Sequence, residues 1–194
     1  MPYNVVLFDG DGVTIKEGRL FSEVLLESHG ISMEAMQPFF KGPFQRCVVG
    51  EADLKEELAK VIGGWGWSGT VDALMHYWFS TGDNLNEEIV SLIKNLRATG
   101  VPCYLVSNNE HYRGAYLWNR LRHLFDGAFI SGDVGFKKNQ EAFFAHVVQK
   151  VHVTDRASIL LIDDDQENVE TAKSFGIDAV HYRQFSDLDG IISL

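Results

Sequence analysis

The strongest constraint on the fold is a series of short apolar runs that alternate with helical patterns. The runs cover residues 5–8, 101–106, 128–130, 158–162 and 179–182. Uninterrupted apolar runs of this length are typical of strands buried on both faces, as strands are in parallel sheets. Helices are predicted between the runs, near residues 86–99, 110–122, 139–150 and 166–175. Alternation of strands and helices implies right-handed crossovers, and it therefore predicts an α/β fold with a doubly wound parallel sheet.

The interval between the first two runs, about 15–85, is much longer than an ordinary crossover. Its patterns are helical, and a structureless loop of this length is uncommon inside a compact domain. We therefore predict a core domain made of residues 1–14 and 86–194, with a small helical cap domain inserted at 15–85.

Three helices are predicted within that interval. The first carries an apolar stripe from Leu20 to Leu25 and ends at Gly30. The second begins at Asp53, which can cap a helix, and runs to Ile62 before a pair of glycines. The third covers 70–80. Asn86 is expected to cap the helix that follows the interval.

Charge and composition exclude several classes of function. The chain carries 17 Lys and Arg against 27 Asp and Glu, a formal charge of −10, so nucleic acid is a poor partner. No stretch approaches the ~20 apolar residues of a membrane helix. The N-terminal residues lack the basic and apolar regions of a signal peptide, and the two cysteines, Cys47 and Cys103, suit a reducing compartment. A cytoplasmic location without membrane contact is the expectation.

Polar side chains follow the ends of the predicted strands. Asp9 and Asp11 follow the first run, Ser107 and Asn108 the second, and 163–165 are three aspartates after the fourth. Each feature alone suits a turn or a helix start, but the carboxyl ends of parallel strands meet at one edge, where ligands bind. Converging carboxylates repel unless some of them are protonated or a cation joins them, and a site with oxygen ligands alone favours Mg²⁺.

In order and spacing, these segments resemble the motifs of the haloacid dehalogenase superfamily of Mg²⁺-dependent phosphohydrolases. The four motifs correspond to Val5–Val13 with Asp-x-Asp-Gly, Cys103–Asn108 with a terminal Ser, Ser131–Lys138 with a Lys before a helix, and Leu160–Asp165 with its acids. The insertion resembles the helical C1-type cap of this family. The later part of the chain is similar to sugar-phosphate phosphatases and to the N-terminal phosphatase domain of soluble epoxide hydrolase.

The resemblance implies roles for individual residues. Asp9 would be the nucleophile that forms an aspartyl-phosphate, and Asp11 the acid and base. Mg²⁺ would lie between Asp9, the backbone carbonyl of Asp11, and Asp164.

Neighbouring residues would support that chemistry. Ser107 and the backbone of Asn108 would hold phosphoryl oxygens, while Lys138, with Lys137 as its rival, would offset charge. Asp163 would bind metal-bound water or orient Lys138. Asp165 is expected to cap a helix, and Asn139 stands where the family usually has Pro.

The predicted function is a Mg²⁺-dependent phosphatase for a small phosphorylated metabolite. Asp11 favours this over carbon–halogen cleavage, because the family's dehalogenases lack the second Asp. A phosphomutase and a non-catalytic Mg²⁺ or phosphoprotein-binding module remain alternatives.

Aromatic residues are concentrated in the predicted cap, and one or two of them are expected to line the substrate pocket. They are Phe39, Phe40, Phe44, Trp65, Trp67 and Trp78.

Overall fold

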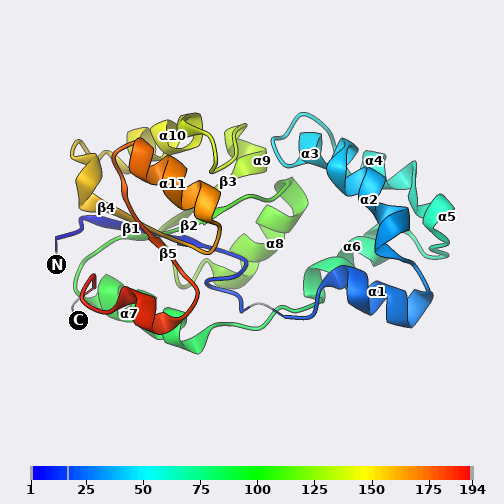
Figure 1. Ribbon diagram of the computed structural model, residues 1–194, viewed down its shortest axis with the longest axis horizontal. Helices are drawn as coiled ribbons and strands as arrows, with labels where there is room; N and C mark the ends of the chain where they lie inside the picture. The colour runs from blue at the N-terminus through cyan, green and yellow to red at the C-terminus, as the bar shows by residue number, and fades with distance from the viewer. Residues whose placement is uncertain (1, 17, 193–194) are drawn as a thin grey trace.

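The computed structural model describes residues 2–16 and 18–192 and has a parallel sheet at its centre (Figure 1). The strands are β1 (Val5–Asp9), β2 (Cys103–Ser107), β3 (Gly127–Ile130), β4 (Ile159–Asp163) and β5 (Asp178–His181). Their order across the sheet is β3-β2-β1-β4-β5, and each neighbouring pair is parallel. The doubly wound α/β fold and the five predicted strands are confirmed. The chain adds β2 and β3 on one side of β1 and then β4 and β5 on the other, so the topological switch point of the sheet lies between β1 and β4.

Helices cover both faces of the sheet, as Figure 1 shows. One face carries α7 (Glu87–Ala98) and α8 (His111–Leu121), and the other carries α10 (Glu141–Val151) and α11 (Gln166–Ser174). Short elements complete this part of the chain. They are α9 (Ser131–Val134), η1 (Arg156–Ser158) and η2 (Phe185–Leu188).

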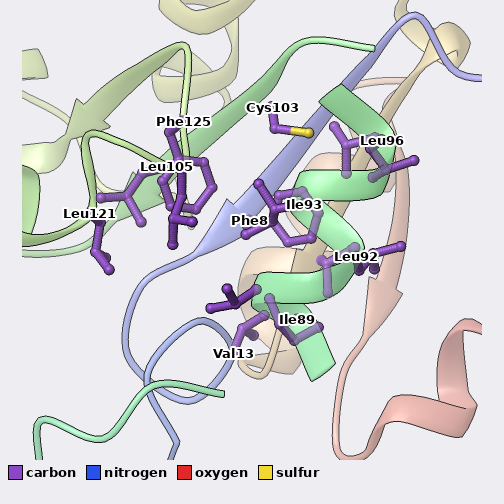
Figure 2. Close-up of a cluster of buried hydrophobic side chains, with 14 of the residues drawn as sticks. Phe8, Val13, Ile89, Leu92, Ile93, Leu96, Cys103, Leu105, Leu121 and Phe125 are labelled. Atoms are coloured by element: carbon purple, nitrogen blue, oxygen red, sulfur yellow. The ribbon is translucent and has the colours of Figure 1, made fainter. Parts of the chain in front are cut away.

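Alternate residues of β1 build the two halves of the core. Val6 and Phe8 pack with α7 and α8, whereas Val5 and Leu7 pack with α10 and α11. Figure 2 shows the first half, in which apolar residues of α7 turn toward Phe8. Burial of both faces explains why β1 reads as an uninterrupted apolar run.

The part of the chain between β1 and α7 forms a second group of helices beyond the edge of the sheet where the strands end (Figure 1). They are α1 (Phe21–His29), α2 (Met33–Lys41), α3 (Pro43–Cys47), α4 (Leu54–Ala59), α5 (Ile62–Trp65) and α6 (Val71–Ser80). This group has its own apolar cluster, which includes Leu25, Met36, Leu58 and Leu74. That it forms a separate cap domain with limits at 15 and 85 stays a prediction.

Two local predictions are wrong. The helix expected from Asp53 to Ile62 stops at Ala59, because Lys60 and Val61 donate to carbonyls only three residues back, and the tighter turn breaks the helix. Asn86 does stand at the start of α7, but its side chain donates to the carbonyl of Val13 and the hydroxyl of Tyr182 instead of capping.

None of the helices within the described residues combines the length and apolar character that a membrane-spanning helix requires. Both cysteines are buried free thiols. Burial raises the pKa of the Cys103 thiol to about 12 and that of Cys47 to about 11.

Candidate active site

The site begins at the end of β1, where Asp9 is the last residue of the strand. The carboxylate accepts a hydrogen bond from the backbone N–H of Gly10 at 2.6 Å, and the Asp9 carbonyl accepts one from the Thr14 hydroxyl at 2.6 Å. These bonds fix the turn that carries Asp11 past the end of the strand. Gly12 completes that turn with φ of +88°, a conformation that favours glycine.

Lys138 lies between two buried carboxylates. Its Nζ atom is 2.6 Å from Asp9 Oδ2 and 2.7 Å from Asp163 Oδ2, and the residue is only 1% exposed. The backbone N–H of Lys138 donates to Asn108 Oδ1 at 2.8 Å, which ties the lysine loop to the end of β2. Lys137 points elsewhere and donates to the side chain of Gln45. Of the two candidate lysines, the structure therefore brings Lys138 to the carboxylates.

Asp163 is fully buried at the end of β4. Besides Lys138, its carboxylate accepts hydrogen bonds from the Asn168 amide and the Asp165 backbone N–H, both at 3.0 Å. Three donors thus hold one carboxylate in place, and this arrangement favours the orienting role among the two roles considered for Asp163. Asp165 accepts from the Glu167 N–H at 2.8 Å and caps α11, as expected.

Asp164 joins Asp9 and Asp163 in a cluster in which carboxylate oxygens of all three residues lie within 4.8 Å of one another. Burial raises the pKa of Asp9 well above its usual range, opposed by Lys138 and reinforced by Asp163. Burial also raises the pKa of Asp164, with a further contribution from Asp163. Both shifts mean that burying these negative charges, and placing them close together, costs free energy.

This cluster fits a hard divalent cation. Its ligand atoms are all oxygens, and its carboxylates carry more negative charge than the ammonium group of Lys138 offsets. The cluster is also closely packed against the turn after β1, because a Cβ atom at Gly12 would lie 2.0 Å from Asp164 Oδ2. The donor set therefore suits Mg²⁺, and the predicted ligand roles of Asp9 and Asp164 stay predictions.

Ser107 is buried at the end of β2, and its hydroxyl accepts a hydrogen bond from the Asn109 amide at 2.8 Å. The same amide donates to Asp11 Oδ2 at 3.0 Å. Asn109 therefore connects the end of β2 to the turn after β1. The predicted phosphate contacts of Ser107 and of the Asn108 backbone stay predictions.

Arg113 is a residue that the sequence analysis missed. Its guanidinium lies 2.7 Å from Asp11 Oδ1 and also donates to the carbonyl of Phe79 in α6. A signal was present in the sequence. Arg113 lies in the first turn of α8, where the helix dipole disfavours a cation unless an anion lies nearby.

The predicted residues converge on one cavity of about 230 Å³, which we call the carboxylate cavity. Its lining includes Asp9, Asp11, Ser107, Asn108, Lys138 and Asp164. Asp163 lies behind this wall against Lys138. The cavity thus combines carboxylates, a buried ammonium group and a hydroxyl, a combination that can bind a cation and a phosphoryl group together.

Comparison with solved structures shows the fold. A Bacteroides thetaiotaomicron haloacid dehalogenase (HAD) family enzyme, solved as a variant with magnesium and inorganic phosphate, is 18% identical with a TM-score of 0.81 over 98% of this chain and 100% of that one. A predicted HAD-like hydrolase from Porphyromonas gingivalis is 20% identical with a TM-score of 0.79 over 98% and 96%. L-2-haloacid dehalogenase from Xanthobacter autotrophicus is 18% identical with a TM-score of 0.67 over 98% and 84%.

Comparison with characterised proteins gives two partial matches and a family. Sesquiterpene phosphatase astK of Aspergillus oryzae is 30% identical over 99 residues, 48% of each protein. Drimenol cyclase drtB of Aspergillus calidoustus is 36% identical over 61 residues, 31% of this chain and 11% of the cyclase. The match thus spans about half the length of one relative and a small part of the other.

The haloacid dehalogenase-like hydrolase model matches residues 3–176. Since that match covers most of the chain, including Lys138 and the ends of β1, β2 and β4 that build the site, the protein belongs to the haloacid dehalogenase-like hydrolases.

Proposed function

We propose that the protein is a Mg²⁺-dependent phosphatase that hydrolyses a small phosphorylated metabolite through an aspartyl-phosphate on Asp9. The observation that carries this proposal is the placement of Asp9 and Asp11 in one cavity with Lys138 and Ser107. Family membership supports hydrolysis, and the partial match to a sesquiterpene phosphatase supports a phosphate ester as the substrate.

The first half-reaction transfers the phosphoryl group to the protein. A carboxylate oxygen of Asp9 attacks phosphorus, and the bond from phosphorus to the leaving oxygen breaks. Lys138 offsets negative charge on the nucleophile and the phosphoryl group, and the Ser107 hydroxyl donates to a phosphoryl oxygen. Mg²⁺, held by Asp9, Asp164 and the backbone carbonyl of Asp11, would supply further positive charge at the phosphoryl oxygens.

Asp11 moves the protons in both half-reactions. It protonates the leaving oxygen, and its carboxylate then takes a proton from the water that attacks the phosphorylated Asp9. That attack releases inorganic phosphate and restores the Asp9 carboxylate. Both Asp11 oxygens are engaged, by Arg113 and by Asn109, so proton transfer requires one of these contacts to open.

An assay of phosphate release with and without Mg²⁺ tests the proposal. We expect Asp9→Asn to lower the rate at least about 1000-fold, because the amide cannot form the acyl phosphate. Asp155→Asn is the matched control, since it makes the same change at a helix cap outside the carboxylate cavity and Asn also caps helices well. That variant should retain the parental rate to within about twofold.

Three outcomes would contradict the proposal. They are phosphate release by Asp9→Asn at the parental rate, release by the parent that does not depend on Mg²⁺, and an isomerised phosphate ester without inorganic phosphate, the result expected of a phosphomutase. Thermal unfolding of both variants checks that a lost rate is not lost folding. Mass spectrometry of acid-quenched parent protein should find the phosphoryl group on the peptide that contains Asp9.

A further inference from the structure

A second cavity adjoins the carboxylate cavity, and its wall is largely apolar. It has a volume of about 220 Å³ and lies between the sheet and the helices of the interval, and we call it the aromatic cavity. Asp11 and Asn109 line both cavities. The proposed proton donor therefore stands at their junction, where the leaving oxygen of a substrate bound at Asp9 would lie.

The apolar wall comes from three helices and the segment before them. Trp78 of α6 is central, because its ring stacks on Phe21 of α1 at 5.4 Å and lies 5.4 Å from Phe44 of α3. Ile15 closes the wall toward the sheet, and Leu20 lies 61% exposed at the mouth. Rings held by one another in this way present a stable apolar surface to a ligand.

Most polar side chains of the wall are engaged with the protein. The Glu110 carboxylate accepts from the backbone N–H groups of Tyr112 and Arg113, and the Arg113 guanidinium pairs with Asp11. Arg19 forms an ion pair with Glu27, and the Thr81 hydroxyl donates to the carbonyl of Tyr77. The hydroxyls of a sugar-like leaving group would have to displace these contacts or remain without hydrogen-bond partners. Either outcome costs binding free energy.

We infer that the aromatic cavity holds the leaving group of the substrate and that this group is an apolar alcohol, not a sugar. The inference rests on the proposed phosphatase function. It assigns the recognition of phosphate to the carboxylate cavity and the choice of ester to the ring of apolar side chains around Trp78. The bond that breaks joins phosphorus to an alcohol oxygen, which leaves with a proton from Asp11.

Two phosphate esters test the inference. Cyclohexylmethyl phosphate and glucose 6-phosphate both carry a primary ester on a six-membered ring, and they differ mainly in the ring hydroxyls. We expect kcat/KM to favour cyclohexylmethyl phosphate by at least about tenfold, since burying unpaired hydroxyls lowers affinity. Equal values, or a preference for glucose 6-phosphate, would overturn the inference while leaving the phosphatase function in place.

Failure of the proposed function gives a different result. No Mg²⁺-dependent release from either ester or from p-nitrophenyl phosphate would refute the phosphatase and the inference together. Release from p-nitrophenyl phosphate, with no preference for cyclohexylmethyl phosphate over the sugar ester, would refute the inference alone.

Two exposed leucines, Leu20 just before α1 and Leu26 within it, provide a test variant and its control without disturbing the core. Leu20 lies at the mouth of the cavity, whereas Leu26 is 50% exposed on the same helix and is not among the lining residues. We expect Leu20→Gln to lower kcat/KM for cyclohexylmethyl phosphate about 3- to 10-fold and to lower that for glucose 6-phosphate by a smaller factor. Leu26→Gln should change neither value. The same loss for both esters in Leu20→Gln, or the same loss for both leucine variants, would also count against the inference.

Discussion

At the scale of single residues, the site depends on how Lys138 balances the charges of Asp9 and Asp163. All three side chains are nearly excluded from water, so each carboxylate charge is tolerated because the Lys138 ammonium group lies within 2.7 Å of it. The sequence predicted that these residues would meet, because the ends of parallel strands share one edge. Arg113 carried only an indirect signal, its place in the first turn of α8, because its contact with Asp11 depends on how α8 is rotated against the sheet.

Replacing Lys138 by Met should therefore damage both folding and activity. The variant leaves two buried carboxylates without their cation, so we expect the free energy of unfolding at neutral pH to fall by about 3–5 kcal/mol. Lys137→Met is the control, and it should cost no more than about 0.5 kcal/mol. Urea unfolding measures both values. Equal losses in the two variants would show that the buried ion pairs do not stabilise the fold.

At the scale of elements, the sequence predicted the strands and helices whose burial leaves an apolar pattern. It missed the short helices that are held mainly by packing against their neighbours. The five strands were predictable because residues buried on both faces form apolar runs. α7 and α8 were predictable from their apolar faces and flanking signals. α2 contains Pro38, which normally interrupts a helix, and α3 has only five residues, so neither produces a clear periodic pattern. Their shared apolar cluster, not local propensity, holds these helices in place.

The start of α8 supplies a prediction about pH. Glu110 caps this helix with 2% exposure, and burial raises the pKa of its carboxyl to about 6, although hydrogen bonds from two backbone N–H groups oppose the shift. A carboxyl with a raised pKa stabilises the fold in its protonated form. Its contribution is complete below the pKa of the unfolded chain, 4.5, and is lost as the pH rises through about 6.

Comparison with Glu110→Gln isolates this contribution, because glutamine does not titrate. Between pH 4 and pH 7.5, we expect the unfolding free energy of the parent to fall by about 2 kcal/mol relative to the variant. Chemical unfolding at a series of pH values provides the measurement. A parent that gains stability over the variant as the pH rises would mean that the N–H donors and Arg113 outweigh burial.

At the scale of the whole molecule, two adjacent segments connect the helices of the interval to the sheet. Ile15 and Leu85 form an antiparallel bridge, and the Lys16 N–H donates to the carbonyl of Asn84. Side-chain contacts hold the two parts together elsewhere, including a hydrogen bond of 2.6 Å from the Tyr112 hydroxyl of α8 to Asp53 at the start of α4. We expect the helices to open and close over the aromatic cavity about the paired segments.

Removing the contact between Tyr112 and Asp53 should therefore loosen the helices without loosening the sheet. A hydrogen bond to a carboxylate at a partly exposed position contributes about 1 kcal/mol, so Tyr112→Phe should speed amide hydrogen exchange in α4 about fivefold. Tyr77→Phe is the matched control, because its hydroxyl donates to Ser28 within the helical group. Exchange in α4 should be unchanged in that variant, and exchange in β1 and β4 should be unchanged in both. If Tyr112→Phe speeds exchange equally in α4 and in the sheet, the contact supports the whole fold, and the helices do not open as a separate unit.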